Sequence, residues 1–304
     1  MKLSTFAPLA LSVAPSLVSA ATGSLGFALG TKNADGSCKA QKDYEADFDA
    51  ISANTPAKVV RGYSASDCNS AQYILPAAKS KNFQVVLGIW PDVDTSYNAD
   101  LSAITKNAPN YADQVWGITV GSETLYRGNF TGAQLAAKMS AVKTATGGKF
   151  KIGTADSWNK YADGTADAVI KSGPDFLFIN AFGFWQGAAI ANASHTYFDD
   201  ISQSFNHIES IAGTGKIELW TGETGWPTTD QTKYEAAVGG VSNAQTFYTS
   251  GICSMLNYGY NAFYFEAFDE PWKPASIGLN GQPADETHWG AMNADRTTKF
   301  PLKC

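Results

Sequence analysis

Two glutamates occupy similar positions in the sequence: each comes shortly after an apolar run and a glycine, Glu223 directly after Gly222 and Glu123 one residue after Gly121. Glu223 lies in LWTGETGWPTT (219–229), and Glu123 lies in GITVGSETLYR (117–127). Glycine lets the chain turn tightly and lets a ligand approach the backbone. A protonated and an ionised carboxyl that face each other across a cleft are what the cleavage of a glycosidic bond requires. The pair therefore predicts a glycoside-cleaving site.

Either glutamate alone has a simpler interpretation. A lone glutamate at such a position is a solvated loop acid or an ion-pair partner of Arg61, Arg127 or Lys160. The matching positions of the two residues in the chain favour the functional interpretation over this one.

The elements that must position these residues follow a regular alternation of apolar runs and helix-compatible segments, which is typical of parallel βα units. Eight strand candidates follow one another without a linker, so we predict one domain, a closed (β/α)8 TIM barrel of α/β class spanning 21–304. A doubly wound open sheet is the alternative. The strand candidates are 24–30, 57–63, 84–90, 115–121, 150–156, 175–182, 216–222 and 261–268.

Residues just after the strands of such a barrel gather at one end, where the chemistry takes place. Here they are rich in carboxylates and in aromatic rings, whose faces suit the C–H faces of sugars. Glu266 either contacts the sugar, tunes Glu223 or forms a structural ion pair, whereas Asp269 and Glu270 are expected to be rim charges. The candidate substrate-binding residues are Tyr63, Trp90, Ser122, Asp156, Trp158, Asn180, Phe182, Phe184, Trp185, Trp226, Glu266 and Trp272.

Several segments together resemble the fungal cell-wall branch of glycoside hydrolase family 17. The resemblance implies a (β/α)8 barrel that acts on β-1,3-glucan with retention of configuration, Glu123 as acid/base and Glu223 as nucleophile. It implies a glucanosyltransferase or a glucanase. The segments are VGSE (120–123), TGETGWP (221–227), SLGFALGTKNADGSCK (24–39), NAFGFWQG (180–187) and FEAFDEPWK (265–273).

Two positions depart from the pattern of related barrels. Ser122 precedes the acid/base where the wider clan usually has an asparagine, and the sixth strand offers no tyrosine to orient Glu223. We expect burial and the charge of Glu223 to raise the pKa of Glu123. Retention requires the two carboxyl groups to lie roughly 5 to 5.5 Å apart. Trp185, Trp226 and Phe184 are candidates to hold an acceptor.

The terminal segments and the net charge of the chain indicate its location and its partners. Residues 1–20 have a basic start, an apolar middle and small residues at the end, which predicts a signal peptide, and the ending FPLKC carries no lipid-anchor signal. The net charge of −6 without a basic cluster argues against nucleic acid and anionic membranes as partners. We expect a secreted monomer of the fungal cell wall that needs no cofactor.

The four cysteines and two sequons agree with an exported protein. Three disulfide connectivities are possible, and pairing between neighbouring loops gives Cys38–Cys68 and Cys253–Cys304. Asn129 and Asn192 lie in N-glycosylation sequons. The cysteine and histidine spacings match no metal site, so we expect no metal.

The sequence leaves the outcome of the reaction open. Transfer to another glucan and hydrolysis share the first chemical step, and endo and exo action are equally compatible with the residues. A wall protein that binds glucan without catalysis, and the same barrel acting on cellulose or mannan, are further alternatives.

Overall fold

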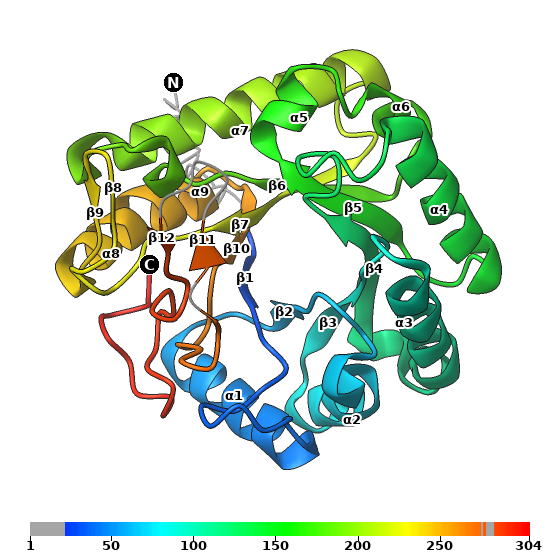
Figure 1. The fold of residues 1–304 in the computed structure, drawn as a ribbon, viewed down its shortest axis with the longest axis horizontal. Coiled ribbons are helices and arrows are strands. Elements are labelled where there is room, and N and C mark those ends of the chain that lie inside the picture. The colour runs from blue at the N-terminus through cyan, green and yellow to red at the C-terminus, as the bar shows by residue number, and fades with distance from the viewer. Residues whose placement is uncertain (1–21, 275, 278–282) are drawn as a thin grey trace, which may run out of the picture.

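The computed structural model describes residues 22–274, 276–277 and 283–304, so the predicted signal peptide lies outside the described residues. Eight parallel strands form a closed barrel in the order β1-β2-β3-β4-β5-β6-β7-β10, with β10 pairing back to β1 (Figure 1). This confirms the (β/α)8 prediction. The barrel strands are β1 (Leu25–Ala28), β2 (Val59–Arg61), β3 (Gln84–Ile89), β4 (Val115–Ser122), β5 (Ile152–Ser157), β6 (Phe176–Asn180), β7 (Glu218–Thr224) and β10 (Asn261–Tyr264).

Helices surround the barrel and connect successive strands (Figure 1). In the described parts of the chain after Tyr264, β10 is not followed by a helix. Two short hairpins, β8–β9 (Lys233–Tyr234 and Ala237–Val238) and β11–β12 (Ser276–Ile277 and Pro283–Ala284), follow β7 and β10. The helices are α1 (Gln41–Asn54), α2 (Ser70–Lys81), α3 (Asp94–Asn107), α4 (Gly132–Ala145), α5 (Trp158–Ala162), α6 (Asp167–Lys171), α7 (Ile190–Ala212), α8 (Val241–Phe247) and α9 (Ser254–Asn257).

Local sequence signals explain some of these boundaries. Thr131 caps α4, because its hydroxyl accepts from the backbone N–H of Gln134 while the Gln134 side chain accepts from the Thr131 N–H. α8 begins at Val241 directly after Gly240, so Ser242 lies inside the helix and does not cap it.

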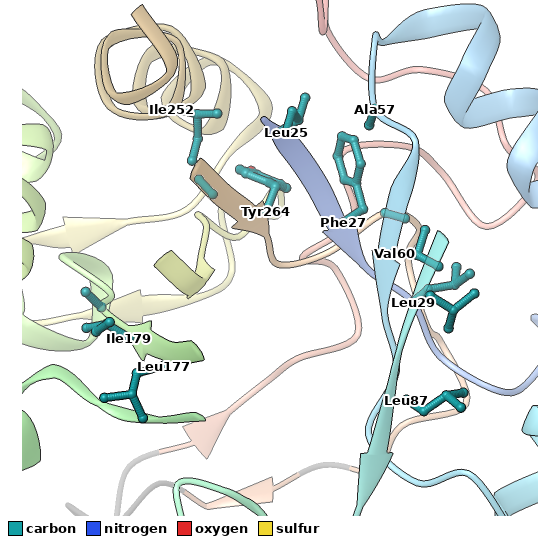
Figure 2. Packing of buried hydrophobic residues seen from close by; sticks show 14 of the residues in the cluster. Leu25, Phe27, Leu29, Ala57, Val60, Leu87, Leu177, Ile179, Ile252 and Tyr264 are labelled. Atoms are coloured by element: carbon teal, nitrogen blue, oxygen red, sulfur yellow. The ribbon is translucent and has the colours of Figure 1, made fainter. Parts of the chain in front are cut away.

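Successive strand residues point to opposite faces, and this alternation creates two apolar layers. Outward-facing residues pack against the helices, as Leu177 and Ile179 of β6 do; Figure 2 shows them with part of this layer. Inward-facing aromatic residues form a separate cluster that includes Phe176, Phe178 and Trp220. These rings fill the barrel below its catalytic end and give the polar residues above them a rigid base.

Both disulfides form as predicted. Cys38–Cys68 joins the loops after β1 and β2, and Cys253–Cys304 joins the end of the chain to the helical segment before α9. Among the described residues, no helix is both long enough and apolar enough to cross a membrane.

Candidate active site

A cleft of about 680 Å³ opens at the carboxyl ends of the barrel strands. Glu123 directly follows the last residue of β4, whereas Glu223 is the second-last residue of β7, because that strand ends two residues later than the sequence predicted. The cleft brings together both glutamates and nine of the twelve predicted substrate-binding residues. These nine are Tyr63, Trp90, Ser122, Trp158, Asn180, Phe182, Trp185, Glu266 and Trp272.

Arg61 at the end of β2 is the buried centre of the site. Its Nη1 lies 2.9 Å from Oε1 of Glu223 and 2.8 Å from the carbonyl oxygen of Gly222, and its Nη2 donates to Ser122 Oγ at 3.0 Å. A guanidinium presents several donors in a fixed geometry, so it can hold a carboxylate in one orientation. Arg61 therefore supplies both the counter-charge and the orientation of Glu223.

Asn180 at the end of β6 connects this centre to the other glutamate. Its side-chain nitrogen donates to Oε1 of Glu123 at 3.1 Å, and its side-chain oxygen accepts from Arg61 Nη1 at 3.4 Å. Phe176, Phe178 and Asn180 alternate along β6, so Asn180 points into the barrel above the two rings. A chain of polar contacts thus runs from Glu123 through Asn180 and Arg61 to Glu223.

The pKa of Glu123 is compatible with a role as proton donor. Burial, and then the negative charge of Glu223, raise the pKa of Glu123 to about 7, although the hydrogen bond from Asn180 opposes this rise. A carboxylic acid with such a pKa keeps its proton in mildly acidic solution and can still release it.

The backbone at Glu123 is strained. Its φ of 55° lies in the left-handed region, which is uncommon for a residue other than glycine. Asp156 on β5 stabilises the turn that follows, because its carboxylate accepts from the backbone N–H groups of Leu125 (2.8 Å) and Tyr126 (3.1 Å). Asp156 was predicted to bind substrate, but it is fully buried and supports the loop instead.

Tyr63 lies beside Glu223. The Arg61 guanidinium carbon is 4.9 Å from the centroid of its ring. Burial, and then the charge of Glu223, raise the pKa of the Tyr63 hydroxyl well above its ordinary value, so the hydroxyl remains a donor. Tyr63, two residues after β2, therefore places a protonated phenol near Glu223, where the sixth strand offers no tyrosine.

A second charged group borders the cleft after β10. Lys273 Nζ lies 2.8 Å from Glu266 and 3.0 Å from Glu270, and both carboxylates are buried. The ion pair proposed for Glu266 is therefore present, and because Glu266 also lines the cleft, its contact with a sugar stays a prediction. The expectation of a rim charge is wrong for Glu270, and also for Asp269, which binds Lys299 at 2.6 Å.

The aromatic residues divide into cleft and core. Trp158, Phe182 and Trp185 line the cleft, whereas Phe184 and Trp226 are fully buried, with their rings 5.1 Å apart. The chain makes a 3₁₀ turn at Phe184–Gln186, which turns neighbouring side chains in different directions. The predictions that Phe184 and Trp226 contact substrate or hold an acceptor are therefore wrong.

Sequence reasoning missed several residues of the cleft. Tyr126, Tyr234, Lys273 and Glu286 line it, but they lie in the connections after β4, β7 and β10, whose course no local pattern reveals. Arg61 was considered only as an ion-pair partner, although a lone arginine in the apolar run AKVVRGY was a usable signal.

The remaining predicted sites lie at the surface. Asn129 is exposed and donates to Asp92 Oδ2 at 2.7 Å, and Asn192 is exposed on α7. Within the described part of the chain, histidine, cysteine, aspartate and glutamate side chains form no group of three that could hold a metal ion.

Comparison with known proteins adds to this geometry. Residues 26–290 match the family model described as the BtgE/BtgC glycoside hydrolase domain. The chain is 56% identical over 305 residues to a glucan 1,3-beta-glucosidase of Arthroderma benhamiae, which covers 100% of this chain and 98% of that protein. It is 41% identical over 296 residues to a glucan 1,3-beta-glucosidase of Saccharomyces cerevisiae, covering 93% and 92% of the two chains.

A solved structure is also similar. The glycoside hydrolase family 17 beta-1,3-glucanosyltransferase of Rhizomucor miehei superposes with a TM-score of 0.77 at 28% identity, over 92% of this chain and 97% of that one. An active-site mutant of that enzyme in complex with laminaritriose gives the same values.

Proposed function

The chain belongs to glycoside hydrolase family 17 through its BtgE/BtgC glycoside hydrolase domain, and from this premise we propose that it cleaves β-1,3-glucan with retention of configuration. The linkage is supported by the relatives, which are named for acting on β-1,3-glucan, and by the laminaritriose complex of the Rhizomucor miehei enzyme. The observation that carries the proposal is the pair of glutamates joined through Asn180 and Arg61 within one aromatic cleft.

In the first step Glu223 attacks the anomeric carbon. A carbon–oxygen bond to Glu223 forms while the glycosidic bond breaks, and the proton of Glu123 passes to the departing oxygen. Arg61 orients the attacking carboxylate, and Tyr63 offers a further donor beside it. Asn180 fixes the direction of the Glu123 carboxyl. We expect a carboxyl separation of roughly 5 to 5.5 Å, as double displacement requires.

In the second step the bond to Glu223 breaks. Glu223 carries no charge in the glycosyl-enzyme, so the repulsion that raises the pKa of Glu123 is reduced and Glu123 can accept the proton of an incoming hydroxyl. The hydroxyl of water gives hydrolysis and that of a sugar gives transfer.

Transfer is the outcome that we favour. The Rhizomucor miehei neighbour is a glucanosyltransferase, and Tyr126, Trp158, Trp185 and Tyr234 of this chain line the cleft beside Glu123 as rings on which an acceptor can stack. Plain endo- or exo-hydrolysis is the alternative. We also propose a location in the fungal cell wall, after removal of residues 1–20 and glycosylation of Asn129 and Asn192, from the sequence signals and the fungal relatives.

A mass-resolved product profile from one laminari-oligosaccharide tests the proposal. Products longer than the input would indicate transfer, and shorter ones alone would indicate hydrolysis. Glu123→Gln and Glu223→Gln variants should lose both activities. A wild-type protein that binds laminarin but releases no product would refute the catalytic proposal, and activity on cellulose or mannan alone would refute the substrate.

A further inference from the structure

A second cavity of about 300 Å³ adjoins the active-site cleft, and we name it the side pocket. Glu270 lies in the wall of both cavities. The Lys32 ammonium in the side pocket is 4.7 Å from the centroid of the Trp272 ring in the cleft. Lys39 in the side pocket donates to the carbonyl oxygen of Gly30, a cleft residue, at 3.0 Å. The two cavities therefore meet along residues 30–32 and 270–272.

Two turns with one sequence pattern line the side pocket. NADGS (33–37) follows β1, and NADRT (293–297) lies near the C-terminus. In each turn the backbone N–H of the asparagine donates to the carbonyl of the last residue at 2.8 Å. In each, the aspartate, Asp35 or Asp295, accepts from the backbone N–H two residues later, at 2.9 and 3.0 Å. Matching turns from opposite ends of the chain therefore give the side pocket a fixed wall.

The charged side chains that line the side pocket compensate one another. The buried Asp47 carboxylate lies 2.9 Å from Lys39 Nζ and 2.8 Å from Arg296 Nε. The lining holds three basic residues, Lys32, Lys39 and Arg296, against four acidic ones, Asp35, Asp47, Asp269 and Glu270. A small cavity with fixed polar groups of both signs suits a neutral ligand with many hydroxyls better than a phosphate or a metal ion.

We propose that the side pocket is a distal subsite that binds a further glucosyl residue of a glucan chain passing over Trp272. The inference rests on the proposed function. Glu270 lines both cavities, and Trp272 lines the cleft within 4.7 Å of Lys32 in the side pocket, so a glucan that extends beyond the cleft at this point comes to the side pocket. Long oligosaccharides should therefore bind more tightly than those too short to reach the side pocket.

The test is the dependence of kcat/KM on chain length, from laminaritriose to laminariheptaose. Ala34→Trp and Ala294→Trp each place a bulky ring on one of the two turns and block the side pocket. The expected result is about a tenfold loss of kcat/KM for the long oligosaccharides, the size expected for one or two lost hydrogen bonds, with little change for the shortest one. The control is Ala137→Trp on the exposed face of α4, which should match the wild type.

Lys32→Ala adds no bulk and provides a second test if the tryptophan variants fold poorly. It should reduce the preference for long chains in the same direction. An unchanged length profile in folded Ala34→Trp and Ala294→Trp would overturn the inference, as would a wild-type profile that is flat with length. A wild-type protein inactive on every β-1,3-glucan would instead refute the proposed function.

Discussion

Replacing Glu223 by glutamine should lower the pKa of Glu123, because it removes a negative charge and keeps the size of the side chain. The pKa of Glu123 rises from 4.5 to about 7, with burial as the first cause and the charge of Glu223 as the second. Burial remains when the charge is removed, so the pKa should fall without returning to its ordinary value, and we expect a fall of about one pH unit, equivalent to about 1.4 kcal/mol.

The assay is an NMR titration of the protein with 13C-labelled glutamate carboxyl groups. Glu123→Gln assigns the signal by its loss. The matched control is Glu209→Gln on the outer helix α7, which also removes one negative charge but lies outside the cleft, and it should leave the titration of Glu123 unchanged. An unchanged pKa in Glu223→Gln would refute the electrostatic coupling of the two carboxyls. Equal falls in Glu223→Gln and Glu209→Gln would show an effect of net charge instead.

The result also bears on the second half of the reaction. In the glycosyl-enzyme that we propose, Glu223 is esterified and uncharged, as the glutamine would be. The pKa of Glu123 in the Glu223→Gln variant therefore estimates its value in the intermediate. A fall below 7 would mean that Glu123 becomes a proton acceptor at the stage when an incoming hydroxyl must lose its proton.

Four further changes test the surroundings of the pair. Arg61→Met leaves Glu223 buried without its counter-charge, so denaturant unfolding should show a loss of about 3–5 kcal/mol; a loss below 1 kcal/mol would contradict the role of the ion pair. Asn180→Ala removes a hydrogen bond that lowers the pKa of Glu123, so kcat should fall and the alkaline limb of the pH–rate profile should move to higher pH; a limb that moves to lower pH would contradict this. Glu123→Gln should stabilise the fold at high pH, because the stabilisation that the raised pKa gives the wild type is complete below pH 4.5 and is lost as the pH rises through about 7. The stability of the variant relative to the wild type should therefore increase by up to about 3 kcal/mol across that window, and thermal unfolding at both ends of it checks the sign. Replacing both Cys253 and Cys304 by serine removes a disulfide that links residues 51 positions apart, so the free energy of unfolding should fall by about 2–4 kcal/mol relative to the oxidised wild type; an equal Tm would contradict this.

Much of the architecture could be predicted from the sequence, because a parallel barrel leaves strong signals. Its strands are buried on both faces and appear as apolar runs, and all eight runs overlap a barrel strand. Closure of the barrel then brings distant strand ends together without further information. Glu123 and Glu223 could therefore be placed in one cleft although 100 positions separate them in the sequence.

The orientation of individual loop residues could not be predicted in this way. Trp226 and Trp185 both follow strand ends, yet Trp226 packs in the core and donates to the carbonyl of Val238, while Trp185 lines the cleft. The difference arises from tertiary packing of the loops after β6 and β7. Lys273 and Glu286 line the cleft but were not predicted to do so, because their position depends on tertiary packing after β10.

The residues at which local rules fail are also those that prepare the site for its reaction. Glu123 adopts a left-handed φ of 55°, and Arg61 is a fully buried charge within a strand. Each feature alone would destabilise the fold. Both persist because neighbours compensate them: Asp156 holds the turn after Glu123, while Glu223, Gly222 and Ser122 accept from Arg61. Arg61 holds the carboxyl group of Glu223 and Asn180 holds that of Glu123 before any substrate arrives. The stability lost at these positions therefore corresponds to reorganisation that the reaction does not need.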